Sequence, residues 1–441
     1  MLKKKQNRIF LFLISLLFAS TGSAQEIYDL PSFINRVLEE NYEVRVQRNL
    51  EKIAKNNDRL GNAGFLPTVD AELTTSKSFN NTNQELSNGT INEGNNAVSN
   101  NLNAYAIVNW VVFDGFKMFA KKDQLNLLAQ LSTVDTKYYL EQTIYDVALA
   151  YYQLLANKEL IENFRNTLDI SRFRYKLEKK KLEVGASNAL SYNQALVDYN
   201  IDSLAVLNYE VAIKSLEIQL SQYASLDPEL PLVFAPDSIY TTSQFVLDSI
   251  LAEAMEANRD LKRSMLEELI AEKSIKIQQA DYYPEVNIYG QYAYSQSTNE
   301  VGFLKQNTIY GPQIGLAVRF NLFNGGNDRR EVVNEKYYAE NATFQRQNSE
   351  TLIRASVLDK FNQYQSLKQR LNLAIENAKA ASRSLEIASA QFQKGIIDGY
   401  DFRQTQLTLI LSENRMIQLE LDLKMLEIDM NRLRGRLLEI L

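Results

Sequence analysis

The chain has no cysteine and no histidine among its 441 residues, and only 7 prolines and 16 glycines. Without cysteine it forms no disulfides, and without histidine it lacks the commonest metal ligand and the usual general base. These absences exclude most hydrolase and zinc chemistry. Carboxylate-only catalysis, as in glycosidases, stays open as a chemistry, but no isolated acidic pair stands out. We therefore expect no enzyme, no cofactor and no metal site.

Glycine and proline are missing altogether from two long windows of nearly equal length, 116–184 and 327–394. A window of this length ordinarily holds about 8 of them. Each would weaken a helix by about 1 to 3 kcal/mol. Each window therefore predicts one helix of about 100 Å. Both windows end at a lone glycine, Gly185 or Gly395.

Paired landmarks indicate that the chain is a duplication. Asn41 and Pro67 recur as Asn258 and Pro284, with the same offset in both pairs. Further along the offset is smaller and again constant, in the pairs Phe113 with Phe323, Gly185 with Gly395, and Gln194 with Gln404. Chance similarity between helical sequences is the competing interpretation, but five landmarks in one order argue against it. The seven extra residues of the first half fall in the Asn-rich segment 80–103, which we expect to be a surface loop.

The first 24 residues predict a cleaved export signal. Four basic residues precede an apolar run at 9–18, and small residues end the segment at Ala24. Ten apolar residues are too few to span a bilayer as a helix, which needs about 20. Residue 25 is glutamine, so lipidation at an N-terminal cysteine is excluded. The net charge of −6 becomes more negative when the signal is removed, so we expect no nucleic-acid partner.

Strand patterns occur once in each half, at 65–113 and 284–323. Val69, Ala71 and Leu73 alternate with polar residues, as a strand with one polar face does. Near the end of the first segment Tyr105, Ile107, Val111 and Phe113 share one side, and Val108 and Trp110 blur the pattern from the other. In the second half the apolar set is Val286, Ile288, Tyr292, Tyr294, Ile314, Leu316, Val318, Phe320 and Leu322. Each half therefore predicts one hairpin of strands about ten residues long.

No run of 18 apolar residues follows the signal, so only strands could span a membrane. The alternation fits an outer-membrane barrel and also fits a soluble sheet lying on a core. Four strands are too few to close a barrel, since about eight is the smallest membrane size. Strands that span lipid would therefore have to be pooled with those of other copies.

The long helices carry apolar residues at heptad spacing, in one series through Tyr138, Tyr145 and Tyr152 and another through Val147, Leu154 and Ile161. Two such seams suggest two helical neighbours. A dimeric coiled coil accounts for this spacing equally well, but it needs no strand hairpins.

The glycines at the ends of these helices predict tight helical hairpins. A left-handed Gly185 followed by Asn188, and Gly395 followed by Asp398, are a C-cap and the next N-cap. The sequence thus predicts a fold that is mostly α with two strand hairpins. The signal at 1–24 is followed by a first repeat at 25–235, with an opening helix at 30–59 and a return helix at 188–224. A non-helical connection at 225–243 leads into the second repeat at 236–441, which has its return helix at 398–438.

These parts in this order resemble the TolC family of outer-membrane efflux proteins over essentially the whole mature chain. The specific elements are Gly-Phe-Leu-Pro at 64–67, Tyr-Tyr-Pro-Glu-Val at 282–286, Val-Phe-Asp-Gly at 112–115 and Leu-Phe-Asn-Gly-Gly at 322–326. The resemblance implies a homotrimer whose twelve strands form one barrel in outer-membrane lipid, continued by an α-helical tunnel across the periplasm. It also implies a periplasmic adaptor that meets the helical tips and connects to an inner-membrane transporter. The tip positions are Val184, Gly185, Asn188, Gly395 and Asp398, all of which also suit plain capping.

The resemblance further implies a gate at the periplasmic end. Asp401 matches the first of two aspartates that ring the TolC constriction, whereas Gln404 replaces the second. Ser191 and Ile397 replace a TolC aspartate and arginine, so the TolC latch is not reproduced here. Three converging carboxylates at Asp401 would attract cations, although Asp401 would also support the first turn of its helix through the dipole.

The sequence therefore predicts a passive exit duct for small molecules or polypeptides, in an efflux or type I secretion system. Arg319 is a candidate barrel-lumen charge or a structural ion pair. The competing class is a periplasmic coiled-coil scaffold, and an acid-pair hydrolase is a third class without a visible site.

Overall fold

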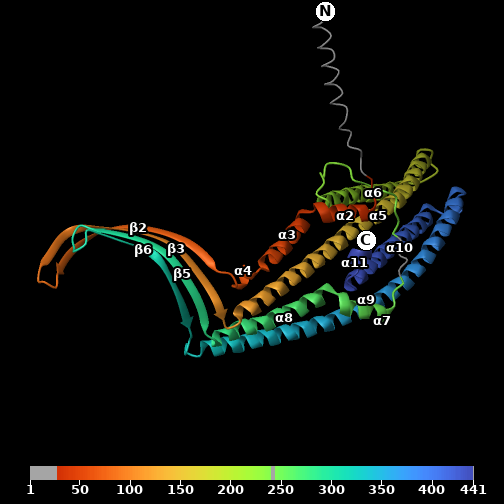
Figure 1. Ribbon diagram of the computed structural model, residues 1–441. Helices are drawn as coiled ribbons and strands as arrows, with labels where there is room; N and C mark the ends of the chain where they lie inside the picture. Colours follow the sequence, from red (N-terminus) through yellow and green to blue (C-terminus); the bar gives the residue numbers. More distant parts are fainter. Residues whose placement is uncertain (1–26, 240–243, 441) are drawn as a thin grey trace, which may run out of the picture. The chain divides into compact units, whose positions relative to one another are not determined.

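The computed structural model describes residues 27–239 and 244–440 (Figure 1). The expected signal peptide lies outside the described residues. The chain forms two compact units, and each draws on both sequence repeats. The first contains the chain up to Arg45, Tyr139–Glu256 and the chain from Arg354, and the second contains Val46–Tyr138 and Ala257–Ile353.

One antiparallel sheet dominates the second unit, with strands in the order β2-β3-β5-β6. These strands are β2 (Thr68–Glu85), β3 (Ile91–Asp114), β5 (Glu285–Asn299) and β6 (Gln306–Arg319). They hold 18, 24, 15 and 14 residues, so the expected length of about ten was too short. Each half contributes one hairpin, and β2 and β6 are the two edges.

The Asn-rich segment 80–103 is mostly strand, which corrects the expected surface loop. Pairing of β2 with β3 continues to Glu85 opposite Ile91, across one irregularity near Asn81. There Asn96 takes a positive φ of 54°, and its backbone N–H donates to Asn81 Oδ1 at 2.8 Å. Asparagine tolerates this conformation and its amide replaces a lost ladder bond. The extra residues therefore lengthen the hairpin.

Strand register sorts the sheet into an apolar and a polar face. Val69 lies opposite Val108, and in the same row follow Gly290 and Ile314. The apolar face also carries Leu73, Trp110, Ile288, Tyr292, Tyr294, Tyr310, Leu316 and Val318. Tyr105 and Ile107 lie on the other face, because Glu72 and Asp70 are their cross-strand partners. The sequence pattern assigned Tyr105 and Ile107 to the apolar face of β3, which is wrong. Both sides of this strand carry apolar residues, so the alternation within the strand does not show which side is the apolar face of the sheet.

The long helices are α5 (Lys117–Glu183) and α9 (Asn327–Gln393), and the return helices are α6 (Ala189–Tyr223) and α10 (Gly399–Leu433). The bounds of α9 and α10 follow those of α5 and α6 at the same offset as the paired tip glycines. The last helix was expected to reach residue 438, but Gly435 takes a φ of 65° and a separate short helix follows, α11 (Leu437–Ile440). In the part of the chain that the structure describes, no helix is long and apolar enough to cross a membrane.

The helix expected at 30–59 is broken, because Asn41 ends α2 (Leu30–Glu40) and starts α3 (Tyr42–Asn57). Its Oδ1 accepts from the backbone N–H of Glu43 at 3.0 Å and of Val44 at 3.1 Å. In the second repeat the paired Asn258 does the same between α7 (Leu247–Ala257) and α8 (Arg259–Gln279). The remaining short helices are α4 (Leu60–Ala63) and the 3-10 turn η1 (Ala280–Tyr282).

An aromatic core anchors the connection between the repeats inside the first unit. The described part of this connection, 225–239, is non-helical. Within it, β4 (Val233–Phe234) pairs in parallel with β1 (Ile27–Tyr28). The Phe234 ring lies 5.1 Å from that of Phe33 on α2 and 5.0 Å from that of Tyr151 on α5. Burying each such ring stabilises the fold by about 1.5 to 3 kcal/mol.

Candidate functional site

The first helical tip is a complete C-cap followed at once by an N-cap. Gly185 has a φ of 72°, and its N–H donates to Leu182 O at 3.1 Å. The next N–H, of Ala186, donates to Lys181 O at 2.7 Å, which completes the Schellman pattern. Asn188 Oδ1 then accepts from the N–H of Ser191 at 2.9 Å.

The second tip repeats this geometry. Gly395 has a φ of 70°, and the N–H of Ile396 donates to Gln391 O at 2.9 Å. Asp398 Oδ1 accepts from the N–H groups of Tyr400 at 3.0 Å and Asp401 at 2.9 Å. All five tip residues therefore lie at cap positions. Val184 is the residue between the last helical residue, Glu183, and the left-handed Gly185, and its side chain is 78% exposed.

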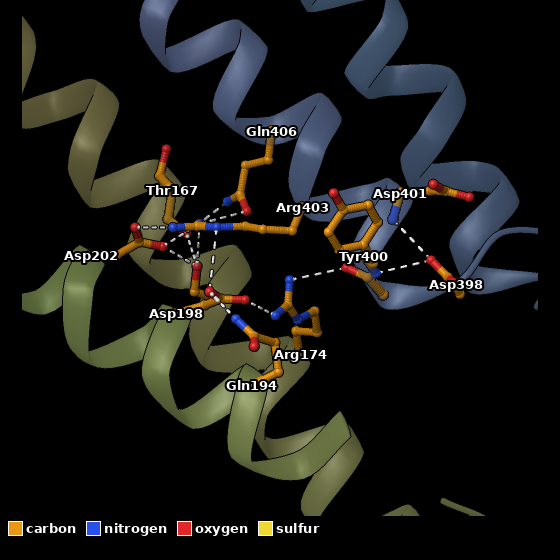
Figure 2. A network of polar contacts seen from close by, with 12 residues as sticks. Thr167, Arg174, Gln194, Asp198, Asp202, Asp398, Tyr400, Asp401, Arg403 and Gln406 are labelled. Carbon is orange, nitrogen blue, oxygen red and sulfur yellow. Dashed lines mark hydrogen bonds and ion pairs between the residues drawn. The ribbon is translucent and has the colours of Figure 1, made fainter. Parts of the chain in front are cut away.

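The three gate candidates lie at the starts of the return helices. Asp401 and Gln404 are both exposed and one turn apart on α10, and Ser191 is half-buried on α6. Figure 2 shows the Asp401 carboxylate directed away from the ionic groups described next. Asp401 also lies in the first turn of its helix, where a negative charge is favourable.

Four buried charges join α5, α6 and α10 just beyond the tips; we call Arg174, Asp198, Asp202 and Arg403 the ionic cluster (Figure 2). Both terminal nitrogens of Arg403 donate hydrogen bonds to the Asp202 carboxylate, at 2.7 and 2.8 Å. Arg174 pairs with Asp198 and also donates to the backbone oxygen of Gly399 at 3.3 Å. The four residues are between 2% and 8% exposed. Two positive and two negative charges leave the cluster neutral.

Neutral polar groups complete this network. Gln406 accepts from Arg403 at 2.9 Å and donates to Thr167 O at 3.2 Å. Ser171 lies 3.4 Å from Arg403 and donates to Asp202. Removing one member of such a buried network leaves its partner uncompensated, at a cost of about 3 to 5 kcal/mol. The cluster was not predicted from the sequence, because its members come from three helices in two different repeats and no local pattern links them.

A groove runs between α9 and α10, and its lining includes the counterparts of the two aspartates of the ionic cluster. It encloses about 420 Å³ and is lined by Arg370, Leu373, Ala374, Asn377, Thr408, Leu411, Ser412, Arg415 and Leu419. Leu373 is 62% exposed and Leu411 68% exposed. Asn377, Thr408 and Ser412 are the second-repeat counterparts of Thr167, Asp198 and Asp202.

An exposed apolar stripe runs along α6. Its members recur three, four or seven residues apart, which puts them on one face of the helix. They are Leu190, Val197, Ile201, Leu204, Val211 and Ile218.

Three carboxylates lie between α5 and α10: Glu413 and Glu420 are half-buried, and Glu159 is more exposed. Burial raises the pKa of Glu420 to about 7, and the negative charge of Glu159 adds to the shift. The pKa of Glu413 is raised by the same two causes. Burial also raises the pKa of Glu159 itself. These groups therefore take up protons more readily than ordinary glutamates.

Arg319 is the last residue of β6 and lies opposite Glu285 on the polar face of the sheet. It borders a hollow of about 470 Å³ where the sheet meets the long helices. The other charged groups that line this hollow are Asp114, Lys117, Asp281, Glu285 and Asp328. Lys117 pairs with Asp281 at 3.3 Å.

Residues 33–225 and 250–436 match the family described as outer membrane efflux protein. The chain belongs to the outer membrane efflux protein family. This confirms the resemblance to TolC that was drawn from the sequence, and with it the duplicated, mostly helical fold. The family makes the chain an outer-membrane exit duct for efflux, and it is a family of channels rather than enzymes.

Solved channel structures share this fold. The outer membrane protein VceC from Vibrio cholerae is 16% identical with a TM-score of 0.73, over 92% of this chain and 96% of VceC. The CmeC channel from Campylobacter jejuni is 13% identical with a TM-score of 0.78, over 92% of this chain and 86% of CmeC. The open state of MtrE from Neisseria gonorrhoeae is 13% identical with a TM-score of 0.71, over 92% of this chain and 88% of MtrE. No curated protein sequence matches the chain. TolC-like channels are trimers that work with adaptors and inner-membrane pumps.

Proposed function

We propose that three copies of this chain form the exit duct, in which each copy contributes its four strands to one closed sheet in the outer membrane. The supporting observation is the pair of open edges, β2 and β6, on a sheet too small to close alone. β2 and β6 run in opposite directions, so β6 of one copy can continue the antiparallel sheet at β2 of the next. Closure would remove edges that otherwise invite aggregation.

The apolar face of the sheet covers most of the height that lipid requires. On β6 it runs from Tyr310 to Val318, and Ile314 is 82% exposed. Eight steps of about 3.3 Å give roughly 26 Å along the strand, which a barrel tilt reduces to about 20 Å. This is close to the apolar band of about 25 Å in known outer-membrane barrels. Arg319 would lie at the polar, inward side of this band.

The helices would assemble into a tunnel by a head-to-tail contact between copies. The α6 stripe of one copy offers apolar side chains, and the α9–α10 groove of the next offers exposed Leu373 and Leu411 beside it. Such a contact joins two different surfaces, so it closes into a ring only when the rotation between copies fits. The trimer of TolC-like channels is the ring that we propose here.

The tips would form the periplasmic mouth and meet the adaptor protein. The side chains of Val184, Ile396 and Tyr400 are between 66% and 78% exposed there. The backbone that carries them is fixed by the capping hydrogen bonds of the two tips. An inner-membrane transporter would supply the energy. The expected export signal at 1–24 is part of this proposal.

Asp401 is the proposed acidic ring of the mouth. Single-channel conductance in a planar bilayer tests it, with Asp401→Asn compared with Asp169→Asn, which removes a carboxylate of 74% exposure elsewhere on the tip hairpins. We expect discrete channels in all three proteins and a lower cation preference only in Asp401→Asn. Channels indifferent to Asp401→Asn would remove the ring from the proposal, and a protein that never inserts would favour the periplasmic scaffold.

A further inference from the structure

The apolar face of the four-stranded sheet carries no charge over most of its height. Strand register sets its residues in rows that cross β2, β3, β5 and β6, and the last apolar row holds Leu73, Ala104, Tyr294 and Tyr310. Between Val318 and this row, no paired residue on the face is Asp, Glu, Lys or Arg. The charges in this part of the sheet lie on the polar face, at Asp70, Glu72, Asp114, Glu285 and Arg319.

The same face becomes polar in the next two rows toward the hairpin turns. The first of these rows holds Thr75, Leu102, Gln296 and Thr308, and the second holds Lys77, Asn100, Thr298 and Gln306. Tyr294 donates its hydroxyl hydrogen to Gln296 Oε1 at 3.2 Å, and Asn100 Nδ2 donates to Thr298 Oγ1 at 3.3 Å. Lys77 is the first charged residue on this face, and it stands beside amide and hydroxyl groups.

The positive charge of Lys77 is open to a ligand. Its side chain is exposed, and no carboxylate of the described residues forms an ion pair with it. Its ammonium lies 5.4 Å from the centre of the Phe79 ring, two residues along on the same face. Asp70 and Glu72, the other charged residues at this end of β2, are on the opposite face and cannot neutralise it.

The height of Lys77 places it at the lipid headgroups. Four steps of about 3.3 Å separate it from Leu73, which is about 13 Å along the strand and about 10 Å in height after the barrel tilt. The helices begin at the other end of the strands, after Asp114 and Arg319. Lys77 therefore belongs to the end of the sheet away from the periplasm, just beyond the hydrocarbon, where the headgroups of the outer leaflet lie.

We infer that Lys77 and the polar row beside it bind a phosphorylated glycolipid of the outer leaflet, at one site on each copy. This inference rests on the proposed barrel, whose apolar face meets lipid. An ammonium group next to a membrane attracts anionic headgroups. The amide and hydroxyl groups of Asn100, Thr298 and Gln306 both donate and accept hydrogen bonds, as sugar hydroxyls require of a partner. A phosphorylated sugar headgroup uses both features, whereas a phospholipid headgroup without sugar uses only the charge.

Native mass spectrometry of the detergent-extracted complex tests the inference, because it resolves bound lipids by mass. The probe is lipid A with both of its phosphates, added in the presence of excess phosphatidylethanolamine. Lipid A without phosphates and phosphatidylglycerol are the comparison lipids. Lys77→Gln removes the charge and Lys77→Arg keeps it. The matched control is Lys52→Gln, which removes an exposed lysine on α3.

We expect the Kd for lipid A to rise about fivefold in Lys77→Gln, because one lysine near an anionic lipid surface contributes about 1 kcal/mol. Lys77→Arg and Lys52→Gln should keep the Kd of the unchanged protein. Removing the phosphates from lipid A should weaken its binding to the unchanged protein and should not weaken its binding to Lys77→Gln.

Equal Kd values for lipid A in the unchanged protein and in Lys77→Gln would overturn the inference. Phosphatidylglycerol bound as tightly as lipid A would also overturn it, in favour of a site for any anionic lipid. The number of copies is measured in the same spectra before lipid is added. A mass of one chain there would contradict the proposed duct itself, so the two failures are distinguishable.

Discussion

The two tips begin alike and then diverge. α6 and α10 both hold 35 residues, and both follow a left-handed glycine and an asparagine or aspartate cap. Two turns further on, α6 carries Asp198 and Asp202 where α10 carries Thr408 and Ser412. The repeats thus kept the residues that fix the backbone and changed the buried charges that bind α6 to α5 and α10.

The largest effect should follow from breaking the ionic cluster. Arg403→Leu leaves Asp202, which is 2% exposed, buried without its partner. We expect the free energy of unfolding to fall by about 3 to 5 kcal/mol, measured by urea unfolding of the extracted protein. The matched control is Arg383→Leu, at an exposed position on α9, which should change stability by less than about 0.5 kcal/mol.

A second variant distinguishes the effect of the charges on stability from that of packing in the ionic cluster. Arg403→Leu combined with Asp202→Leu removes both charges and keeps apolar volume, so much of the lost stability should return. Equal destabilisation in the single and double variants would mean that Asp202 does not depend on Arg403.

The next effect should come from copying the charges of the ionic cluster to the corresponding positions of the other repeat. At the contact proposed between the α6 stripe of one copy and the α9–α10 groove of the next, Asn193→Arg with Thr408→Asp and Ser412→Asp would place a guanidinium opposite two carboxylates. We expect channel opening to fall about tenfold, equivalent to about 1.4 kcal/mol of added closure, in single-channel recordings. Asn193→Gln with the same two aspartates is the control, because it lacks the pairing charge. Equal opening in both proteins would show that these positions do not meet.

The smallest effect concerns pH and Glu420. Its pKa in the folded chain is raised from 4.5 to about 7, so the folded state holds its proton more tightly than the unfolded state. The resulting stability is present below about pH 4.5 and is lost as pH rises through about 7. Allowing for solvent screening at a half-buried group, the loss is about 1 kcal/mol.

Glu420→Gln should reduce this pH dependence by the contribution of Glu420, measured as the melting temperature between pH 5 and pH 8. Exposed Glu376→Gln is the matched control and should leave the dependence in place. A Glu420→Gln protein that loses as much stability over this range as the unchanged protein would assign the effect to Glu159 or Glu413.

Much of the fold could be predicted from the sequence, because its signals are local. The missing glycines and prolines set the long helices, and Gly185, Gly395, Asn188 and Asp398 set the tips within a residue or two. The Asn-rich hairpin could not be predicted in this way. Asparagine is a poor strand former by propensity, and only pairing with a partner strand supplies the backbone bonds that extend β2 and β3.

The site was less predictable than the fold. The positions of Asp401, Gln404 and Ser191 followed from a motif and a count from the tip glycine. The ionic cluster depends on α5, α6 and α10 meeting in three dimensions. No spacing in the sequence distinguishes Asp202 or Arg403 from the many charged residues on helical surfaces. A charged residue on one repeat whose counterpart in the other repeat is neutral is the one available signal.

The mass of the detergent-extracted complex, measured by native mass spectrometry, tests the central claim most directly. The sheet edges, the α6 stripe and the α9–α10 groove all require partners from other copies of the chain. We expect a complex of three copies, released only by detergent. A single chain released from membranes by a salt wash would contradict the duct and would support the periplasmic scaffold instead.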